Sequence, residues 1–327
     1  MTSLAIRKKN VPSRPRGGLA VAKLRFVTGV TVPLLLYESL AIFVLGWAFL
    51  LMFYDYSPGR LGGPILGLGG SNPFVGVENF IEMLTGHSVR AVLFRTSLRN
   101  TLIFAFAVLP LNLLITLPLA WLLESISRYK TLYRTIYFMP VLTSSVGVAL
   151  IWMSMYDPQA GWLNAILRLL GVRPVAWLSD PRAGLAGVSV AMWAVILAYL
   201  WQDYGYNMVI FIAALQGVPQ ELKEMAMIDG ATSWRIFTRI VIPLIQPTLL
   251  FVCVMTMLSS FQVFDIIQVM TNGGPNNQTQ VLLLDIYKNA FRYQSMGWAA
   301  AESFVLFLIV MIVTVVQMRV LRTSWEY

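Results

Sequence analysis

Residues 219–247 read PQELKEMAMIDGATSWRIFTRIVIPLIQP and form a polar stretch between two long apolar segments. Pro219 suits the first turn of a helix, because its missing N–H has no partner there in any case. Glu221 and Glu224 follow near the positive end of the helix dipole, where acidic side chains are favoured. Gly230 ends this helix, since glycine enters the left-handed conformation at little cost. The stretch therefore predicts a short helix, a glycine turn and a second helix.

Both predicted helices have an apolar face. In the first, Leu222, Met225 and Ala226 recur at the spacing of one helical face. In the second, that face carries Trp234, Phe237, Val241 and Leu244. On spacing alone, an ordinary loop with a solvated amphipathic helix explains this pattern. The order of the residues is more specific than their spacing, as described below.

The composition indicates an integral membrane protein. Of the 327 residues, 57% are hydrophobic and only 12% are charged, and the mean hydropathy is +0.70. The single cysteine, Cys253, excludes a disulfide within the chain and makes a cysteine-based metal site improbable. The net charge of +9 is explained by membrane topology, so we expect no nucleic-acid partner. The lone histidine, His87, lies in a predicted loop and receives no role.

Six apolar segments predict an all-α, polytopic membrane protein with six transmembrane helices, each long enough for a hydrocarbon core of about 30 Å. The segments are 31–53, 100–123, 135–155, 185–212, 243–264 and 297–319. Pro110 and Pro118 are expected to break the second segment, and Pro140 to kink the third. Glu38 lies within the first segment and should face protein or water, because charge is costly at bilayer depth.

The chain divides by composition into four parts. These are a disordered basic tail at 1–29, the first span with an external segment at 30–96, a five-helix core at 97–320 that contains the polar loop 219–243, and a C-terminal tail at 321–327. Lysines and arginines number seven in the N-terminal tail, three in 124–134, three in the central loop and two near the C-terminus, against nine in the other loops. This bias predicts that both termini are cytoplasmic.

The polar loop resembles the EAA loop of ABC importer permeases. The match consists of Glu224-Met225-Ala226, then Gly230, then Ile240 and Ile242-Pro243 at the family's spacing. Met225 stands where the family usually has alanine, and Ile242 where it often has leucine.

Three further stretches are similar to the carbohydrate-uptake branch of this family. They are Pro73–Phe80, Trp201–Pro219, and Phe264–Pro275 with the later Thr279, Tyr287 and Phe291. The turn Thr-Asn-Gly-Gly-Pro is typical of subunits that resemble the first maltose or glycerol-phosphate permease component, and the likeness covers most of residues 75–320.

The resemblance implies a type I importer permease core. Its loop would be a coupling helix that docks into a cleft of an ATP-hydrolysing subunit, with coupling residues Glu221, Glu224, Ala226, Asp229, Gly230 and Pro243. The implied partners are a second homologous permease, two ATP-binding cassette subunits and an extracytoplasmic solute-binding protein in the bacterial or archaeal cell membrane. The sequence has no Gly-x-x-x-x-Gly-Lys-Ser/Thr loop, so ATP and Mg²⁺ are expected on the partner ATPases rather than here.

The expected substrate is a sugar, an oligosaccharide or a polyol such as glycerol phosphate. Sugars combine hydroxyl rims with apolar C–H faces, which suits aromatic rings beside amides and carboxylates. The candidates on 185–212 are Gln202, Asp203 and Tyr206, and those further on are Ser260, Phe264 and Gln268, which would share one face of a continuous helix. The alternative is that these polar groups join helices to one another, as is common in membranes.

Two other functions were weighed. An ion-driven secondary transporter would use Glu38, Asp203 and Glu302 as proton or sodium ligands. A membrane enzyme would need acids, histidines or serines clustered at membrane depth, yet no span contains a histidine. Neither accounts for the pattern from Glu224 to Pro243, so we predict a transporter subunit without catalytic residues or a metal site.

Overall fold

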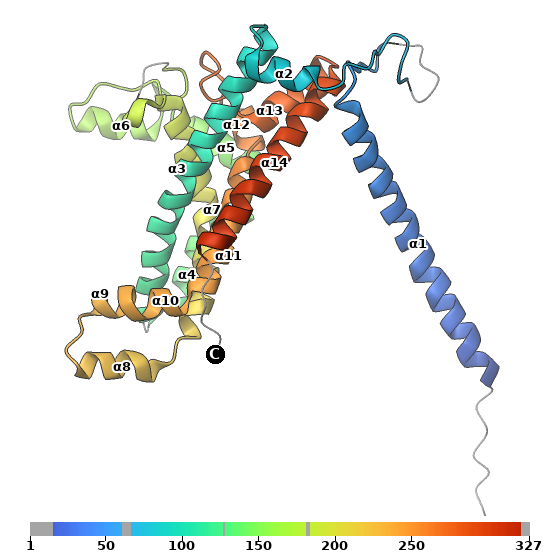
Figure 1. Cartoon of the computed structure of the whole chain (residues 1–327). Coiled ribbons are helices and arrows are strands. Elements are labelled where there is room, and N and C mark those ends of the chain that lie inside the picture. Colours follow the sequence, from blue (N-terminus) through green and yellow to red (C-terminus); the bar gives the residue numbers. More distant parts are fainter. Residues whose placement is uncertain (1–15, 61–66, 127, 181–183, 322–327) are drawn as a thin grey trace, which may run out of the picture. The chain divides into compact units, whose positions relative to one another are not determined.

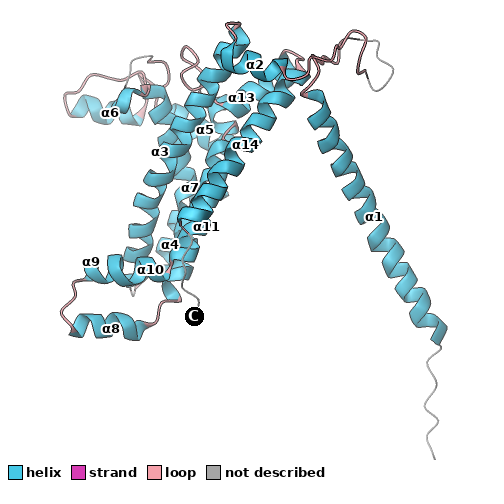
Figure 2. Cartoon of the chain, in the orientation of Figure 1, coloured by secondary structure: helices cyan, strands magenta, loops and turns pink. Residues whose placement is uncertain are grey.

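The computed structural model describes residues 16–60, 67–126, 128–180 and 184–321. Within these ranges the chain is helical, with loops and isolated β-bridges such as Tyr54–Phe74 between the helices (Figure 2). The chain forms two compact units, residues 1–50 and residues 51–327. The prediction of an all-α protein is confirmed.

The first unit is the helix α1, which spans Arg16–Leu51 (Figure 1). Its apolar part, Phe26–Leu51, is long enough to cross a membrane. The expected disordered tail at 1–29 is therefore wrong for its second half, and residues 1–15 lie outside the described ranges. The glycines at 17 and 18 fall in the first turn, whose N–H groups have no helical partner, and the residues after them are good helix formers.

The second unit begins with a short helix, α2 at Glu78–Thr85, followed by α3 at Val89–Ser125. Ser88 caps α3 by accepting a hydrogen bond from the Ala91 N–H. This helix starts well before the expected residue 100 and passes Pro110 and Pro118 without a break, which corrects the prediction. Proline has a helical φ, so each one removes a single backbone hydrogen bond, and neighbouring helices in a membrane protein tolerate that loss.

The third predicted segment has the expected kink near Pro140, in the form of a sharp bend. Helix α4 at Lys130–Phe138 continues through the 3₁₀ turn η1 at Met139–Leu142, and α5 follows at Ser145–Met155, turned by 98°. Ser144 caps α5 by accepting a hydrogen bond from the Gly147 N–H. The loop after α5 contains a helix that the sequence did not indicate, α6 at Trp162–Leu169.

The rest of the unit is a long helix followed by many short ones. Helix α7 spans Val190–Gln216 and leads into the polar loop. The loop holds α8 at Gln220–Ile228, α9 at Ser233–Ile236, the π-helix η3 at Phe237–Val241 and α10 at Ile242–Leu244. Beyond it lie α11 at Gln246–Phe261, α12 at Asp265–Met270, α13 at Leu282–Tyr287, the π-helix η4 at Lys288–Arg292 and α14 at Met296–Val320.

Four stretches of the described chain are long and apolar enough to cross a membrane, and the bent pair α4–α5 makes a fifth if it forms one span. Helix α7 has 27 residues but is not among them. Its centre carries Gln202, Asp203 and Asn207, which lower its hydropathy. The predicted count of six spans therefore stays a prediction.

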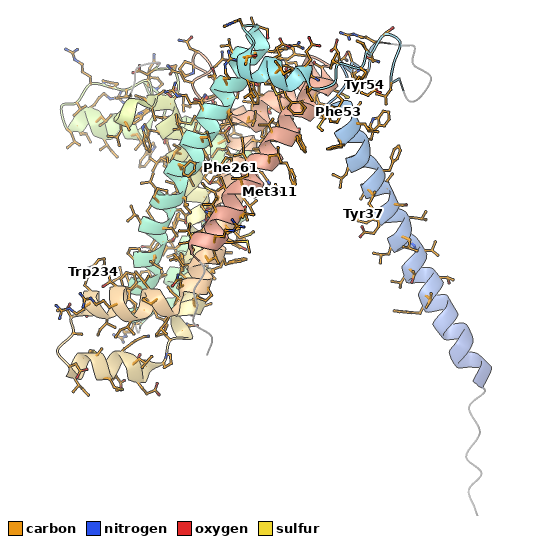
Figure 3. All side chains as sticks on the ribbon, in the orientation of Figure 1. Tyr37, Phe53, Tyr54, Trp234, Phe261 and Met311 are labelled. Atoms are coloured by element: carbon orange, nitrogen blue, oxygen red, sulfur yellow. The ribbon has the colours of Figure 1, made fainter. Side chains whose placement is uncertain are left out.

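Three buried clusters hold the second unit together. One joins α3, α5, α7 and α12 around Phe104 and Trp152. Another joins the C-terminal halves of α3 and α7 to η3 and α11 around Phe211 and Phe237. The third joins α2, α3, α11 and α14 around Trp298 and Phe261, and Phe261 is labelled in Figure 3. Helix α3 packs along α7 and α11, so these helices form the frame that positions the polar loop.

Candidate functional site

The polar loop lies at one end of the second unit, and α2, α6 and α13 lie at the other (Figure 1). The predicted helix, glycine turn and second helix are present as α8, Gly230 and α9. The loop is thus a separate helical hairpin below the ends of α3 and α7.

The turn after α8 is a Schellman motif. The Ala231 N–H donates to the Ala226 carbonyl at 2.9 Å, and the Gly230 N–H donates to the Met227 carbonyl at 3.0 Å. Gly230 has a φ of +80°, which favours glycine at this position. Ala226 and Ala231, the apolar pair of the motif, pack against the cluster around Phe237. The turn therefore fixes where α8 ends and how closely it approaches the helices above.

Most of α8 faces away from the protein. Glu221, Glu224 and Asp229 are exposed, as are Met225 at 62% and Ile228 at 86%. Of the expected apolar face, Ala226 alone is drawn inward, while Leu222 and Met225 stay largely exposed. An exposed apolar patch flanked by acids is typical of an interaction surface.

The second helix of the loop does not keep one straight face. Phe237 and Val241 are buried, whereas Trp234 is 69% exposed at the outer edge of the loop (Figure 3). The Trp234 ring lies 5.6 Å from that of Phe237. The π-helix η3 widens the turn just before Pro243, which is exposed in α10, and so alters the register that a regular helix would give.

Gln202 lines a cavity at the bend between η1 and α5. Its Nε2 donates to the Thr143 carbonyl at 3.0 Å and to Ser145 Oγ at 3.3 Å. The cavity of about 280 Å³ also includes Tyr199, Ser259, Gln262 and Phe264. The structure thus brings the predicted residues Gln202 and Phe264 together.

Asp203, the next residue of α7, lies in a hydrogen-bonded network between helices. Its Oδ2 accepts from Asn112 Nδ2 on α3 at 2.9 Å and from Asn207 Nδ2 at 3.1 Å. Asn207 also donates to Asn112 Oδ1 and to Thr256 Oγ1 on α11. The contacts of Asp203 are therefore those of a residue that joins helices, the alternative weighed from the sequence.

The expected common face of Ser260, Phe264 and Gln268 is wrong, because the helix is interrupted. α11 ends at Phe261, and Phe264 has a φ of −143° and a ψ of −66° before α12 begins. Ser260 is fully buried and donates to the Thr256 carbonyl at 2.6 Å. Gln268 instead lines a second cavity, beside Tyr287.

Tyr206, the last predicted substrate residue, is 43% exposed on α7. Sequence reasoning missed Tyr199, whose hydroxyl donates to Ser259 Oγ at 3.0 Å in the cavity that Gln202 lines. It also missed Lys288 and Arg292, which line the cavity beside Gln268. The spacing of Tyr199 and Gln202, three residues apart on one helix, was the available signal.

The fold and the loop define a polytopic, all-helical membrane protein with an exposed helical hairpin at one end. Residues 116–323 match the family model described as the binding-protein-dependent transport system inner membrane component. The chain belongs to this family, and it is a permease subunit of the ABC importer type.

Several characterised or named proteins are similar over most of their length. A probable ABC transporter permease protein of Pyrococcus horikoshii is 34% identical over 86% of this chain and 89% of its own. The sn-glycerol-3-phosphate transport system permease protein of Pectobacterium atrosepticum is 34% identical over 79% and 83%. The osmoprotective compounds uptake permease protein of Synechocystis is 35% identical over 77% and 87%.

A solved structure confirms the fold. A chain of a bacterial ABC transporter involved in the import of the acidic polysaccharide alginate superposes with a TM-score of 0.71, over 95% of this chain and 100% of that one. The two sequences are 20% identical, so this likeness bears on the fold alone.

Proposed function

We propose that this permease subunit serves an ATP-driven importer for a sugar, an oligosaccharide or a related polyol such as glycerol phosphate. The observation that carries the proposal is the exposed helix α8, fixed by the Gly230 turn at one end of the helical unit. The names of the relatives, which cover glycerol phosphate and osmoprotective compounds, support the substrate class.

In this proposal α8 is the coupling helix and docks into a cleft of an ATP-binding cassette subunit. Met225 and Ile228 supply apolar contacts, while Glu221, Glu224 and Asp229 meet basic groups of the partner. Ala226 holds the helix to the membrane unit through the buried cluster. Movement of the ATPases then reaches α3, α7 and α11 through that cluster.

The complete transporter would contain a second homologous permease, two ATPase subunits that bind ATP and Mg²⁺, and an extracytoplasmic solute-binding protein. Both termini and the loop 219–243 would be cytoplasmic, in line with the charge bias of the sequence. Alternating access would expose the cavity lined by Gln202, Tyr199 and Phe264 to each side in turn.

Charge reversal on α8 tests the coupling. We expect Glu224→Lys to weaken association of the ATPase subunits with the membrane complex, measured by co-purification and by substrate-stimulated ATP hydrolysis. Glu78→Lys is the control, because Glu78 is also exposed on a short helix but lies at the other end of the unit. Equal association of both variants and of the wild type would contradict the assigned role of α8.

Uptake into membrane vesicles distinguishes the importer from the ion-driven alternative. Its candidate ligands Asp203 and Glu302 are hydrogen-bonded to neutral side chains, Glu302 by Trp298 Nε1 at 2.7 Å and by Asn289 Nδ2 at 3.1 Å. Uptake into vesicles that requires internal ATP and survives ionophores would support the importer. Uptake that ionophores abolish and ATP does not restore would support the ion-driven transporter.

A further inference from the structure

A second cavity lies at the end of the unit opposite the polar loop, where α12, α13 and η4 meet. It has a volume of about 350 Å³ and is lined by Gln268, Asn272, Tyr287, Lys288, Phe291 and Arg292, among others. We call it the η4 cavity. It is separate from the cavity that Gln202 lines, since the two share no residue.

Two cationic side chains from one turn of η4 line this cavity. The π-helix places Lys288 and Arg292 four residues apart, and its wide turn closes with the Tyr293 N–H donating to the Lys288 carbonyl at 2.8 Å. Lys288 Nζ is held in place by the Asn272 carbonyl at 2.9 Å and by Gln280 Oε1 at 2.8 Å. Arg292 is exposed, and none of the ion pairs formed within the described ranges includes it.

The charge at this turn is only partly neutralised. Burial lowers the pKa of Lys288, and the nearby Arg292 lowers it further, while Asp285 acts in the opposite sense. Asp285 is itself buried and accepts hydrogen bonds from Ser97 Oγ at 3.3 Å and from Gln280 Nε2 at 3.2 Å. A second buried carboxyl, that of Glu302, accepts a hydrogen bond from Asn289 Nδ2 within η4. Among the residues that the structure describes, no acidic one lines the cavity itself, so its lining carries the two cations Lys288 and Arg292.

The other walls combine aromatic rings with amides. The ring centroids of the lining residues Tyr287 and Phe291 are 5.3 Å apart. Phe264, which lines the other cavity, packs behind Tyr287 with its ring centroid 5.0 Å away. Gln268 lines the same cavity as the two cations, and its buried Oε1 has no hydrogen-bond partner. An acceptor of this kind suits a hydroxyl group, and the rings suit the C–H face of a sugar or polyol.

We propose that the η4 cavity binds the anionic group of a phosphorylated or carboxylated sugar or polyol, with Lys288 and Arg292 on the anion and Gln268 on a neighbouring hydroxyl. This inference rests on the proposed importer function and narrows its substrate class. Phosphate and carboxylate share the chemistry that a guanidinium and an ammonium group recognise. A neutral sugar would leave Arg292 without a charged partner.

The test is equilibrium binding to the purified permease complex in lipid nanodiscs, without ATP and without the binding protein. The probes share a carbon skeleton with their neutral counterparts: D-glucuronate, which also matches D-glucose in size, and glucose 6-phosphate against D-glucose, and glycerol 3-phosphate against glycerol. We expect at least one anionic probe to bind more tightly than its neutral counterpart. Its affinity should fall as ionic strength rises, because salt screens an exposed charge.

Two variants locate the effect. Arg292→Gln should weaken the anionic probe about tenfold, as expected for loss of one charge-assisted contact, and leave the neutral probes unchanged. The control is Arg173→Gln, since Arg173 is an exposed arginine outside the cavity. Gln268→Glu keeps the side-chain size but adds a negative charge, so it should reject the anionic probes selectively.

The inference is overturned if anionic and neutral probes bind equally to the wild type, or if Arg292→Gln acts no differently from Arg173→Gln. In a second measurement with the binding protein added, the inference is also overturned if Arg292→Gln weakens only the association of that protein, since the anion would then be an acidic side chain. Either result leaves ATP-driven uptake of a neutral sugar intact, so failure here is distinguishable from failure of the proposed function.

Discussion

Substitutions at Gly230 test whether the polar loop transmits movement or only connects two helices. The residue ends α8 with a φ of +80°, and a Cβ built there meets no other atom of the chain within 4 Å. A substitution at this position therefore creates backbone strain but no steric clash within the subunit. Any larger effect must arise from what the loop contacts in the assembled transporter.

The positive φ of Gly230 sets the free-energy cost of the backbone strain that each substitution would introduce. Alanine in the left-handed region costs about 1–2 kcal/mol, and a change of 1 kcal/mol shifts a local population ratio roughly fivefold. Asparagine and aspartate enter this region more readily than alanine, so their backbone strain is smaller although their side chains are larger. Strain alone thus predicts that Gly230→Ala is the most harmful variant, whereas docking into a close cleft predicts the reverse.

We expect the order of severity that docking predicts. Gly230→Asp should abolish uptake, Gly230→Asn should impair it severely, and Gly230→Ala should retain part of it. The assay is substrate-stimulated ATP hydrolysis and transport by complexes purified with their ATPases and binding protein, after confirming that the membrane subunit is present in normal amount. Normal hydrolysis and transport by Gly230→Asp would show that the stretch is only a loop. A more severe effect of alanine would assign the loss to strain and refute the docking argument.

Three further predictions concern the membrane unit. Asp203→Ala should lower the free energy of unfolding of the detergent-solubilised subunit by about 1–3 kcal/mol, because the Asn112 and Asn207 amides lose an acceptor. Unchanged thermal unfolding together with altered transport would instead place Asp203 on the substrate path. Tyr206→Ala or Gln268→Ala should reduce uptake or change sugar preference without loss of assembly, and wild-type uptake of every tested substrate would remove both from the path. Cysteines can be placed one at a time in a chain that lacks Cys253. Those at the exposed positions 170 and 277 should react with an external thiol reagent, and those at 128 and 230 should not. External labelling at 128 or 230 would show that the predicted topology is inverted.

The polar loop could be predicted almost completely, because its signals are local. A helix start at Pro219, early acids and a glycine stop depend only on neighbouring residues, and the structure has this order. The face of the second helix could not be predicted. A π-helix at Phe237–Val241 depends on packing against α3 and α7, and no residue in the stretch encodes it locally.

The helix boundaries were predicted less well where apolar runs continue into polar ones. Hydropathy marks the part of a helix that meets lipid, so it missed the first turns of α3 and the start of α1 at Arg16. The expected breaks at Pro110 and Pro118 are wrong, whereas the expected kink near Pro140 is present. Pro110 and Pro118 leave α3 unbroken, whereas the turn at Pro140 is followed by a bend of 98°. Ser144, which caps α5, was the local signal that a new helix begins after Pro140.

The polar residues of α7 show why a site is harder to predict than a fold. Asp203 and Asn207 are four residues apart and face α3 and α11, where amides and a hydroxyl satisfy them. Tyr199, Gln202 and Tyr206 follow the i, i+3, i+7 spacing of one helical face, and Asp203, at i+4 from Tyr199, lies on the same face. Tyr199 and Gln202 line the cavity beside Ser259, and Tyr206 lies one turn further on. The helical period therefore does not separate Asp203 from these residues, whereas its hydrogen bonds to Asn112 and Asn207 do. On this argument Tyr199 belongs to the candidate path and Asp203 does not.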